Sequence, residues 1–487
     1  MRRVVAGTVA LILAVGGYVT ADVYDLVPGV LTLDRASSNA GIPAVPTSGS
    51  SPSPTVAPAP IPKAAASAAA PLLVAAGAAP MPTRAGLTAA LVKALADTGL
   101  GSSVGLIVRD ASTGAHLLDV SAEVPRIPAS TAKLLTATAI ISTLDPSLTF
   151  STRAVRGASA DDVILVAGGD TLLSPGKGDP ATVAGRAGLA DLAEQTAKAL
   201  KAQGVTSVRL HIDERYASGA RYAPGWLRAD INDGLTGPVA MLGLSTQRPT
   251  HGKAAPADPA SSTAQAFRTA LAAHGVTVAP AIDWAASPKG ARELGVVRSA
   301  PLSDVLALAL TNSDNALAES LARQAAHKAG RSTSFAAVAG WVKEMVAAKG
   351  VDTKGVTLVD ASGLSSGSLV TARALGDVLD LAAGGQDPAL QNVIAQLPVA
   401  GLSGTLADRF LTGPVHAAAG IARAKTGTLT GASALAGTVV DKDGRLLTFA
   451  ILADRVPPGV GTLTARAALD RFVATLASCG CGSGGQA

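Results

Sequence analysis

Ser130 and Lys133 lie three residues apart at the start of an apolar stretch, RIPASTAKLLTATAIISTL, which spans residues 126–144. The stretch predicts a mostly buried helix that stops before Pro146, and side chains three residues apart share one face of a helix. A serine hydroxyl needs an adjacent base to become a good nucleophile, and a buried lysine can be held neutral to act as that base. A simpler interpretation is also open, in which the serine caps the helix and the lysine reaches water.

Two further tripeptides favour catalysis over capping. Ser313-Asp314-Asn315 interrupts a helical run, and Lys425-Thr426-Gly427 leads into the C-terminal strands. A second Ser-x-x-Lys pattern, from Ser174 to Lys177, contains Pro and Gly and does not fit a helix. The three motifs in this order, each beside a suitable element, predict an active site built on Ser130.

Some of these residues are predicted to take part in the reaction. We expect Ser130 to be the nucleophile, Lys133 its base, and Ser313 a proton relay toward a leaving amine. Lys425 is expected to lower the pKa of Lys133 and to bind a substrate carboxylate together with Thr426.

The others are predicted to bind the substrate. Asn315 can hold a substrate amide, and Thr428 can join Thr426 at the carboxylate. The backbone N–H groups of Ser130 and Thr428 can form an oxyanion hole, the first aided by the helix N-terminus. The predicted substrate-binding residues are Asn315, Thr426, Gly427 and Thr428, and neither a metal ion nor a cofactor is expected.

The set S-T-A-K, S-D-N and K-T-G resembles that of serine penicillin-binding proteins and β-lactamases. The long separation of Ser130 from Ser313 implies an inserted region. With that insertion the chain is most similar to the class C low-molecular-mass penicillin-binding proteins, which are the D-alanyl-D-alanine carboxypeptidase/endopeptidase family, and it resembles the actinobacterial type. Four further stretches support the resemblance: VAGGDTLLS (166–174), VDASGLSSGSLVT (359–371), LPVAGLSGTLADRF (397–410) and ARAKTGTLTGASALAG (422–437).

The resemblance implies an α/β (α+β) fold, with a β-lactamase/transpeptidase-like catalytic domain whose antiparallel sheet is flanked by helices, plus an inserted α/β module. It implies a serine peptidase that hydrolyses the D-alanyl-D-alanine end, or the D-alanyl cross-links, of peptidoglycan stem peptides through an acyl-enzyme at Ser130. β-Lactam antibiotics would be covalent inhibitors. Two alternatives stay open: a serine β-lactamase or esterase, and an inactive penicillin-binding scaffold of the cell wall.

The expected domains follow from shifts in composition. Arg2 and Arg3 before an apolar run predict a signal peptide or membrane anchor in residues 1–34, so the body lies outside the cytoplasm. Residues 35–85 form an Ala/Pro/Ser-rich linker. The catalytic domain takes residues 86–155 and 296–478, the inserted module 156–295, and a flexible tail 479–487.

Strand and helix signals fit this division. Strands are expected at 104–109 and 115–120. Strands and helices are expected to alternate within 156–295, and helices to follow from about 301. A hairpin around D-K-D-G and a closing helix complete the chain. The two cysteines, Cys479 and Cys481, are interpreted as part of the frayed tail, although a disulfide or a metal site is also conceivable for them.

Composition argues against nucleic-acid binding, and a second possible nucleophile motif has a structural interpretation. The net charge of +5 and an aromatic content of 3% give no basic, aromatic surface for nucleic acid. Gly363-Leu364-Ser365-Ser366-Gly367 matches the nucleophile elbow of α/β-hydrolases but is interpreted as a turn near the active site. Asp170 and Asp360 are expected to play structural roles in turns.

Overall fold

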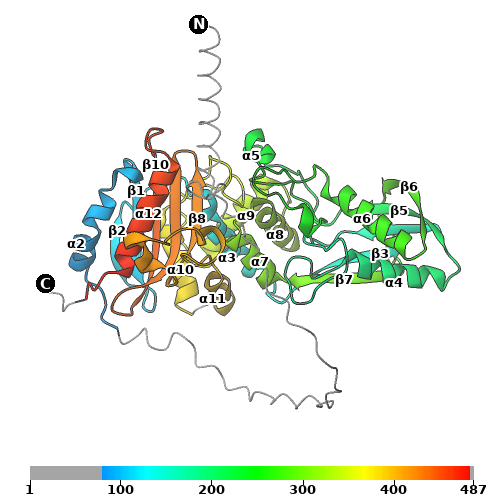
Figure 1. The fold of residues 1–487 in the computed structure, drawn as a ribbon, viewed down its shortest axis with the longest axis horizontal. Coiled ribbons are helices and arrows are strands. Elements are labelled where there is room, and N and C mark those ends of the chain that lie inside the picture. The colour runs from blue at the N-terminus through cyan, green and yellow to red at the C-terminus, as the bar shows by residue number, and fades with distance from the viewer. Residues whose placement is uncertain (1–78, 386, 483–487) are drawn as a thin grey trace, which may run out of the picture.

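The computed structural model describes residues 79–385 and 387–482, and Figure 1 shows them as two sheets joined by a group of helices. The signal or anchor at 1–34 and most of the linker at 35–85 lie outside the described residues. No described helix is long and apolar enough to cross a membrane.

The first sheet is antiparallel and carries the strands from both ends of the body. Its order is β2-β1-β10-β9-β8, so the N-terminal hairpin pairs with the C-terminal strands. The expected strands at 104–109 and 115–120 are present with slightly different ends. The strands are β1 (Ser103–Asp110), β2 (His116–Val120), β8 (Ala422–Leu429), β9 (Ala432–Val440) and β10 (Leu446–Asp454).

Strand β10 is central, and helices cover both of its faces. Phe449 and Ile451 join the core on one face, while Ala450 and Leu452 join the core on the other. This alternation with period two explains why β10 reads as a continuous apolar run. One face packs against α2 (Arg84–Leu95) and α12 (Thr462–Ala477). The other packs against α3 (Lys133–Ile141) and α10 (Ala372–Ala383), and α11 (Pro388–Ala395) packs on these two helices.

The second sheet lies at the other end of the molecule (Figure 1) and has the order β6-β5-β4-β3-β7. Strands β4, β5 and β6 run parallel, whereas β3 pairs antiparallel with both β4 and β7. Two helices, α4 and α6, cover one face with a separate apolar core. The elements are β3 (Thr149–Arg156), β4 (Asp162–Val166), α4 (Leu189–Lys201), β5 (Ser207–Asp213), α5 (Arg228–Asn232), α6 (Pro259–Ala273), β6 (Thr277–Trp284) and β7 (Glu293–Pro301).

The expected edges of the inserted module need correction. Boundaries at 155/156 and 295/296 cut through β3 and β7, which both belong to the second sheet. The alternating pattern of a strand does not say which sheet it joins, because pairing is a long-range contact. We refer to the region from β3 to β7 as the second-sheet module, and its status as a separate domain stays a proposal.

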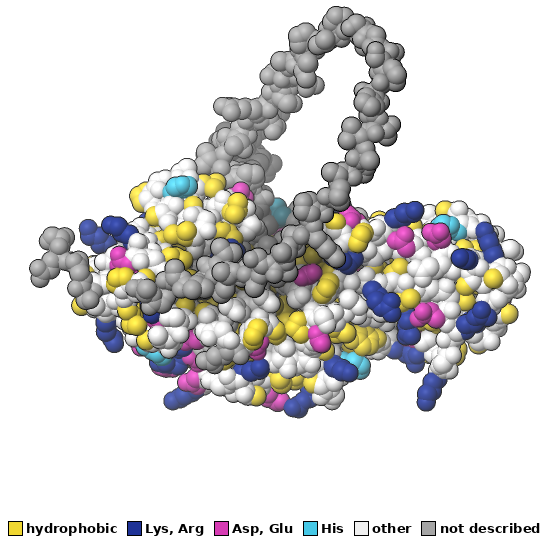
Figure 2. All heavy atoms as spheres, turned by 90° about the horizontal axis from the view of Figure 1, so that it is seen from below, with side chains coloured by type: hydrophobic (Ala, Val, Ile, Leu, Met, Phe, Trp, Pro, Cys, Tyr) yellow, Lys and Arg dark blue, Asp and Glu magenta, His cyan; other side chains and the backbone are white. Residues whose placement is uncertain are grey.

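Figure 2 shows one face of the molecule, on which Lys and Arg side chains gather over the second-sheet module. Asp and Glu side chains lie between them on the same face. This end therefore presents mixed charge instead of a surface of one sign.

Helices α7 (Leu302–Thr311), α8 (Asn315–Lys328) and α9 (Phe335–Ala348) lie between the two sheets (Figure 1). The expected break at Ser313-Asp314-Asn315 separates α7 from α8. Asp314 is the N-cap of α8, and its carboxylate accepts from the backbone N–H of Leu317 at 2.9 Å. Short 3₁₀ segments complete the chain: η1 (Thr98–Leu100), η2 (Ala129–Ala132), η3 (Ser245–Gln247), η4 (Gly404–Leu406) and η5 (Gly413–Ala418).

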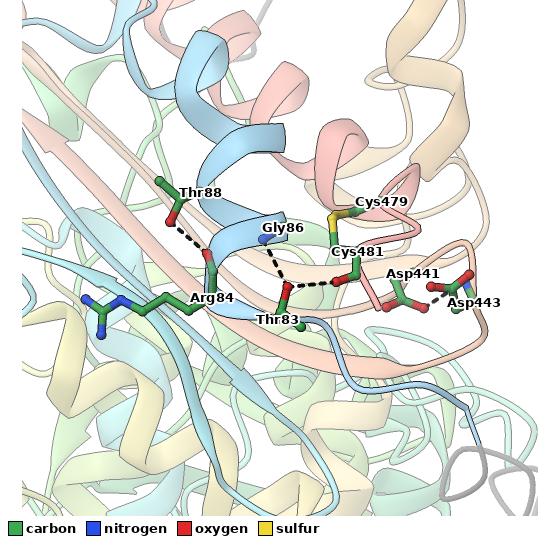
Figure 3. Close-up of a disulfide and its surroundings, with 8 residues drawn as sticks. All are labelled: Thr83, Arg84, Gly86, Thr88, Asp441, Asp443, Cys479 and Cys481. Carbon is green, nitrogen blue, oxygen red and sulfur yellow. Dashed lines mark hydrogen bonds between the residues drawn. A yellow bond between two sulfur atoms is a disulfide. The ribbon is translucent and has the colours of Figure 1, made fainter. Parts of the chain in front are cut away.

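The flexible tail expected at 479–487 is wrong for residues 479–482. Cys479 and Cys481 form a disulfide and are buried. The carbonyl of Cys481 accepts from the backbone N–H of Thr83 at 2.9 Å, and Thr83 caps helix α2 by accepting from Gly86 (Figure 3). A side chain at position 86 would bring a Cβ within 2.8 Å of that same carbonyl, so glycine permits the contact. The two ends of the folded body are therefore joined, which composition did not reveal.

Candidate active site

Ser130 and Lys133 touch, as their spacing predicts, but Ser130 does not cap a helix. It lies in the 3₁₀ segment η2, and α3 begins only at Lys133. Neither segment has a side-chain cap, and Lys133 is 1% exposed. The interpretation of a simple cap with a solvated lysine is therefore wrong.

The amino group of Lys133 has three hydrogen-bond partners. Its Nζ lies 2.8 Å from Oγ of Ser130, 2.5 Å from Oδ1 of Asn315 and 2.7 Å from the carbonyl oxygen of Ser362. A neutral amine has two N–H bonds and one lone pair. With Asn315 and Ser362 taking the two N–H groups, the lone pair would face Ser130, which is the direction from which a base must accept the hydroxyl proton.

Burial is the cause of an altered pKa at Lys133. Loss of hydration lowers its pKa to about 8, and the nearby carboxylates of Asp360, Glu319 and Asp314 oppose this change. Burial is the largest of these effects, because removing an ammonium from water disfavours its charged form. The expected contribution of Lys425 to the lowered pKa of Lys133 stays a prediction.

Lys425 contacts the second motif. Its Nζ donates to Oγ of Ser313 at 2.8 Å and to the carbonyl of Thr426 at 2.9 Å. The side chain is fully buried, so its charge acts from beneath the surface. Ser313 has a φ of +53°, a left-handed conformation that is uncommon outside glycine and persists only where the surroundings hold it.

A cleft of about 560 Å³ opens between these motifs and the second-sheet module. Five of the predicted site residues line it: Ser130, Ser313, Asn315, Thr426 and Thr428. The opposite wall includes Leu235, Arg248 and His251 from the second-sheet module. Lys133 and Lys425 are not part of the lining, so the hydroxyls face the cleft and the two lysine side chains lie behind them.

Gly427 brings strand β8 close to the serine turn. A Cβ at this position would lie 2.5 Å from the carbonyl oxygen of Pro128. The third motif therefore needs glycine so that β8 can pass directly beside η2. This approach places Thr428 and Ser130 in the lining of one cleft, as an oxyanion hole shared by their backbones would require.

Residues 360–365 form a loop beneath Lys133 that our motif search did not assign to the site. Asp360 accepts from the backbone N–H groups of Ser362, Gly363 and Ser365, and from Nε1 of Trp226. The structural role expected for Asp360 is thus observed. The G-x-S-x-G segment is a turn beside the site, in which Ser365 is buried and Gly363 lines the cleft.

Asp170 is also buried in a turn, where its carboxyl accepts from the backbone N–H of Leu172 at 2.8 Å. Burial raises the pKa of Asp170 to about 7. This contact agrees with the structural role that we expected.

Glu319 supports the same loop from below. It follows Asn315 by four residues on α8, and its Oε1 accepts from the backbone N–H groups of Ala361 at 2.8 Å and Ser362 at 2.7 Å. Burial raises the pKa of Glu319 to about 8. The spacing i to i+4 on a helix from a site residue is the signal that could have identified Glu319 from the sequence.

Replacing Glu319 tests this support. Glu319→Ala removes the acceptor of the buried Ala361 N–H, while the Ser362 N–H keeps its second acceptor, Asp360. We expect the substitution to lower the free energy of unfolding by about 1–3 kcal/mol. Glu319→Gln keeps an oxygen acceptor and should lose less. Denaturant unfolding measures both variants, and equal losses would contradict the role of the two hydrogen bonds.

Comparison with known proteins agrees with this geometry. The family model for the D-Ala-D-Ala carboxypeptidase 3 (S13) family matches residues 87–251 and 244–476. The chain belongs to this family. The resemblance to class C penicillin-binding proteins is thereby confirmed, as is the serine-type D-Ala-D-Ala carboxypeptidase class.

Individual relatives cover most of the chain. Carboxypeptidase DacB of Mycolicibacterium smegmatis is 41% identical over 413 residues, which cover 83% of this chain and 86% of that protein. A D-alanyl-D-alanine carboxypeptidase of an Actinomadura species is 30% identical over 433 residues, covering 71% and 77%. The crystal structure of penicillin-binding protein 4 from Haemophilus influenzae aligns with a TM-score of 0.64 at 21% identity, covering 81% and 98%. This last match confirms the expected fold class.

Proposed function

We propose that this serine DD-peptidase hydrolyses the D-alanyl-D-alanine end of peptidoglycan stem peptides through an acyl-enzyme at Ser130. The observation that carries the proposal is the arrangement around Nζ of Lys133, which is buried, has a lowered pKa and lies 2.8 Å from the Ser130 hydroxyl at the cleft.

Acylation follows from these contacts. Oγ of Ser130 attacks the carbonyl carbon of the penultimate D-alanine, and Lys133 takes the hydroxyl proton. The C–N bond then breaks and an ester forms on Ser130. Ser313 passes its proton to the leaving amine of the terminal D-alanine and regains one from the proton that Lys133 took up, with Lys425 beside it at 2.8 Å. Water then attacks the ester carbonyl and gives a proton to Lys133, and that proton returns to Oγ of Ser130 as the C–O bond breaks.

Substrate recognition is divided between hydroxyls, a buried cation and the backbone. The Thr426 and Thr428 hydroxyls bind the terminal carboxylate, and Lys425 supplies positive charge from behind Thr426. The Ser130 and Thr428 N–H groups bind the oxygen of the tetrahedral intermediate. Asn315 donates to Leu235 at 2.8 Å in this structure, so holding a substrate amide would require that bond to be exchanged.

A cross-link between stem peptides presents the same D-alanyl bond with a larger leaving group. We therefore include endopeptidase activity, and β-lactam antibiotics as covalent inhibitors that acylate Ser130. The family acts outside the cytoplasm, and the apolar N-terminal run supports export or attachment to the outer face of the membrane.

The β-lactamase alternative needs a carboxylate that activates water for deacylation. In the part of the chain that the structure describes, Asp314 is the one acidic side chain in the lining of the cleft. It is already ion-paired with Arg248. This supports slow deacylation of β-lactams and ranks the peptidase first.

Mass spectrometry of muropeptides after incubation with the purified protein tests the function. We expect pentapeptides to lose one D-alanine, while conversion of cross-linked dimers to monomers measures the endopeptidase share. Nitrocefin is the control, because sustained turnover would indicate a β-lactamase. A protein that is labelled by penicillin but leaves every muropeptide unchanged would contradict the proposal and favour the scaffold.

A further inference from the structure

The second motif is held by an arginine from the second-sheet module. The guanidinium of Arg248 binds both carboxylate oxygens of Asp314, with its Nε 2.9 Å from Oδ2 and its Nη2 in contact with both oxygens. Each side chain is mostly buried, with 19% and 17% exposed. A two-pronged contact of this kind sets the orientation of the carboxylate as well as its distance.

Asp314 connects two catalytic neighbours. Ser313 precedes it in a left-handed conformation, and Asn315 follows it with Oδ1 on Lys133. Burial alone would raise the pKa of Asp314, but Arg248 outweighs this effect and the pKa lies below its ordinary value. The carboxylate thus remains charged, caps α8 and gives the strained Ser313 a rigid neighbour.

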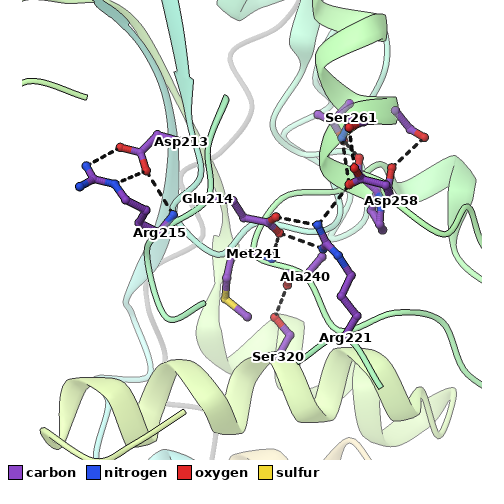
Figure 4. A network of polar contacts seen from close by, with 12 residues as sticks. Asp213, Glu214, Arg215, Arg221, Ala240, Met241, Asp258, Ser261 and Ser320 are labelled. Carbon is purple, nitrogen blue, oxygen red and sulfur yellow. Dashed lines mark hydrogen bonds and ion pairs between the residues drawn. The ribbon is translucent and has the colours of Figure 1, made fainter. Parts of the chain in front are cut away.

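The segment that carries Arg248 is itself anchored on α8. Leu235 accepts from Nδ2 of Asn315 at 2.8 Å, and the carbonyl of Ala240 accepts from Oγ of Ser320 at 3.0 Å. Figure 4 shows the other side of this segment, where Glu214 accepts from the backbone N–H of Met241 and pairs with Arg221. The wall of the cleft is therefore fixed at several points before Arg248 meets Asp314.

We propose that Arg248 is a positioning residue that holds Ser313 and Asn315 through Asp314, so that the second-sheet module completes the active site. This deepens, and rests on, the proposed function. Without Arg248, the Asp314 carboxylate loses its ion pair in a mostly buried place. Ser313 would then be free to leave the conformation in which it meets Lys425, and the proton relay would be disordered.

A double-mutant cycle tests the inference with the full chain. We expect Arg248→Met to lower two rates by about 10–100-fold: acylation by a fluorescent penicillin, and kcat on a D-Ala-D-Ala peptide. This is the size of effect seen when a side chain that orients a site residue, without touching the reacting atoms, is removed. KM should change little, because Arg248 acts through Asp314. Arg248→Lys keeps the charge and should recover part of the rate.

Asp314→Asn retains a helix-capping side chain and supplies the second arm of the cycle. If Arg248 works through Asp314, adding Arg248→Met to Asp314→Asn should cost much less than adding it to the natural protein. Equal losses in the two backgrounds would overturn the proposal and show that Arg248 contacts the substrate itself. Unchanged kinetics in Arg248→Met would overturn it as well.

Two controls separate this result from other failures. Arg209 of the second-sheet module also forms ion pairs, with Asp161 and Asp162, but is absent from the cleft lining. Arg209→Met should leave the kinetics unchanged, and equal rate losses in it would overturn a specific role for Arg248. If the natural protein neither reacts with penicillin nor releases D-alanine, the proposed function is contradicted, independently of the role of Arg248. Thermal unfolding shows whether Arg248→Met and Asp314→Asn are folded. If Arg248→Met is not folded, the kinetics of Asp314→Asn test the inference instead.

Discussion

Ser130→Ala is expected to abolish covalent labelling by penicillin and to lower D-alanine release by about 10⁴-fold or more. The substitution removes the only atom that can form the ester in the proposed reaction, while Lys133 and the cleft remain. The residual rate would come from binding and from the backbone N–H groups of the oxyanion site. Intact-protein mass spectrometry detects the acyl adduct directly.

Ser365→Ala is the matched control for this experiment. Ser365 belongs to the competing G-x-S-x-G pattern, is buried and is not part of the cleft lining. We expect the variant to be labelled at the natural rate. An adduct on the Ser130→Ala protein, or the loss of labelling in Ser365→Ala alone, would show that the nucleophile is assigned to the wrong residue.

Lys133→Ala is expected to lower the acylation rate by about 10²–10⁴-fold, the range that a positioned general base contributes. Lys133→Arg should be similarly slow, since a guanidinium keeps its proton throughout the working range of pH. The natural protein should show the corresponding pH dependence. Its base is the neutral amine, so the acylation rate should rise with pH and level off above the Lys133 pKa of about 8.

Stopped-flow measurement of acylation across the stable pH range provides this profile. Lys343 is a suitable control, because its Nζ also donates to a backbone carbonyl, that of Val356 at 2.7 Å, away from the cleft. Lys343→Ala should retain the rising profile. A rate that stays flat or falls as the pH increases through 8 would exclude neutral Lys133 as the base.

The features of the fold and of the candidate site that were predicted from the sequence are those that depend on local patterns. A spacing of three positions from Ser130 to Lys133 suffices to bring them together, because a helical turn fixes that geometry within a few bonds. The break at Ser313-Asp314-Asn315 and the apolar runs of β9 and β10 on either side of the D-K-D-G turn are equally local. The motif set indicated the family and the fold class, which the comparisons confirm.

Contacts between distant segments required the tertiary structure. Strands β3 and β7 contain ordinary strand signals, but pairing partners far along the chain decided that they belong to the second sheet. Cys479 and Cys481 looked like a loose tail because the sequence does not show that their segment packs beside Thr83.

The sequence by itself determined which residue types carry the proposed chemistry and in what order, since their spacing follows from helix and turn geometry. Only the tertiary structure decided how that chemistry is tuned. The pKa of Lys133 depends on burial, and its amino group donates to Asn315 and to the carbonyl of Ser362, which come from two other segments. Arg248 reaches Asp314 from the second-sheet module. Desolvation and ion pairing depend on everything that surrounds a group in space, and neighbours in the chain supply only a small part of those surroundings.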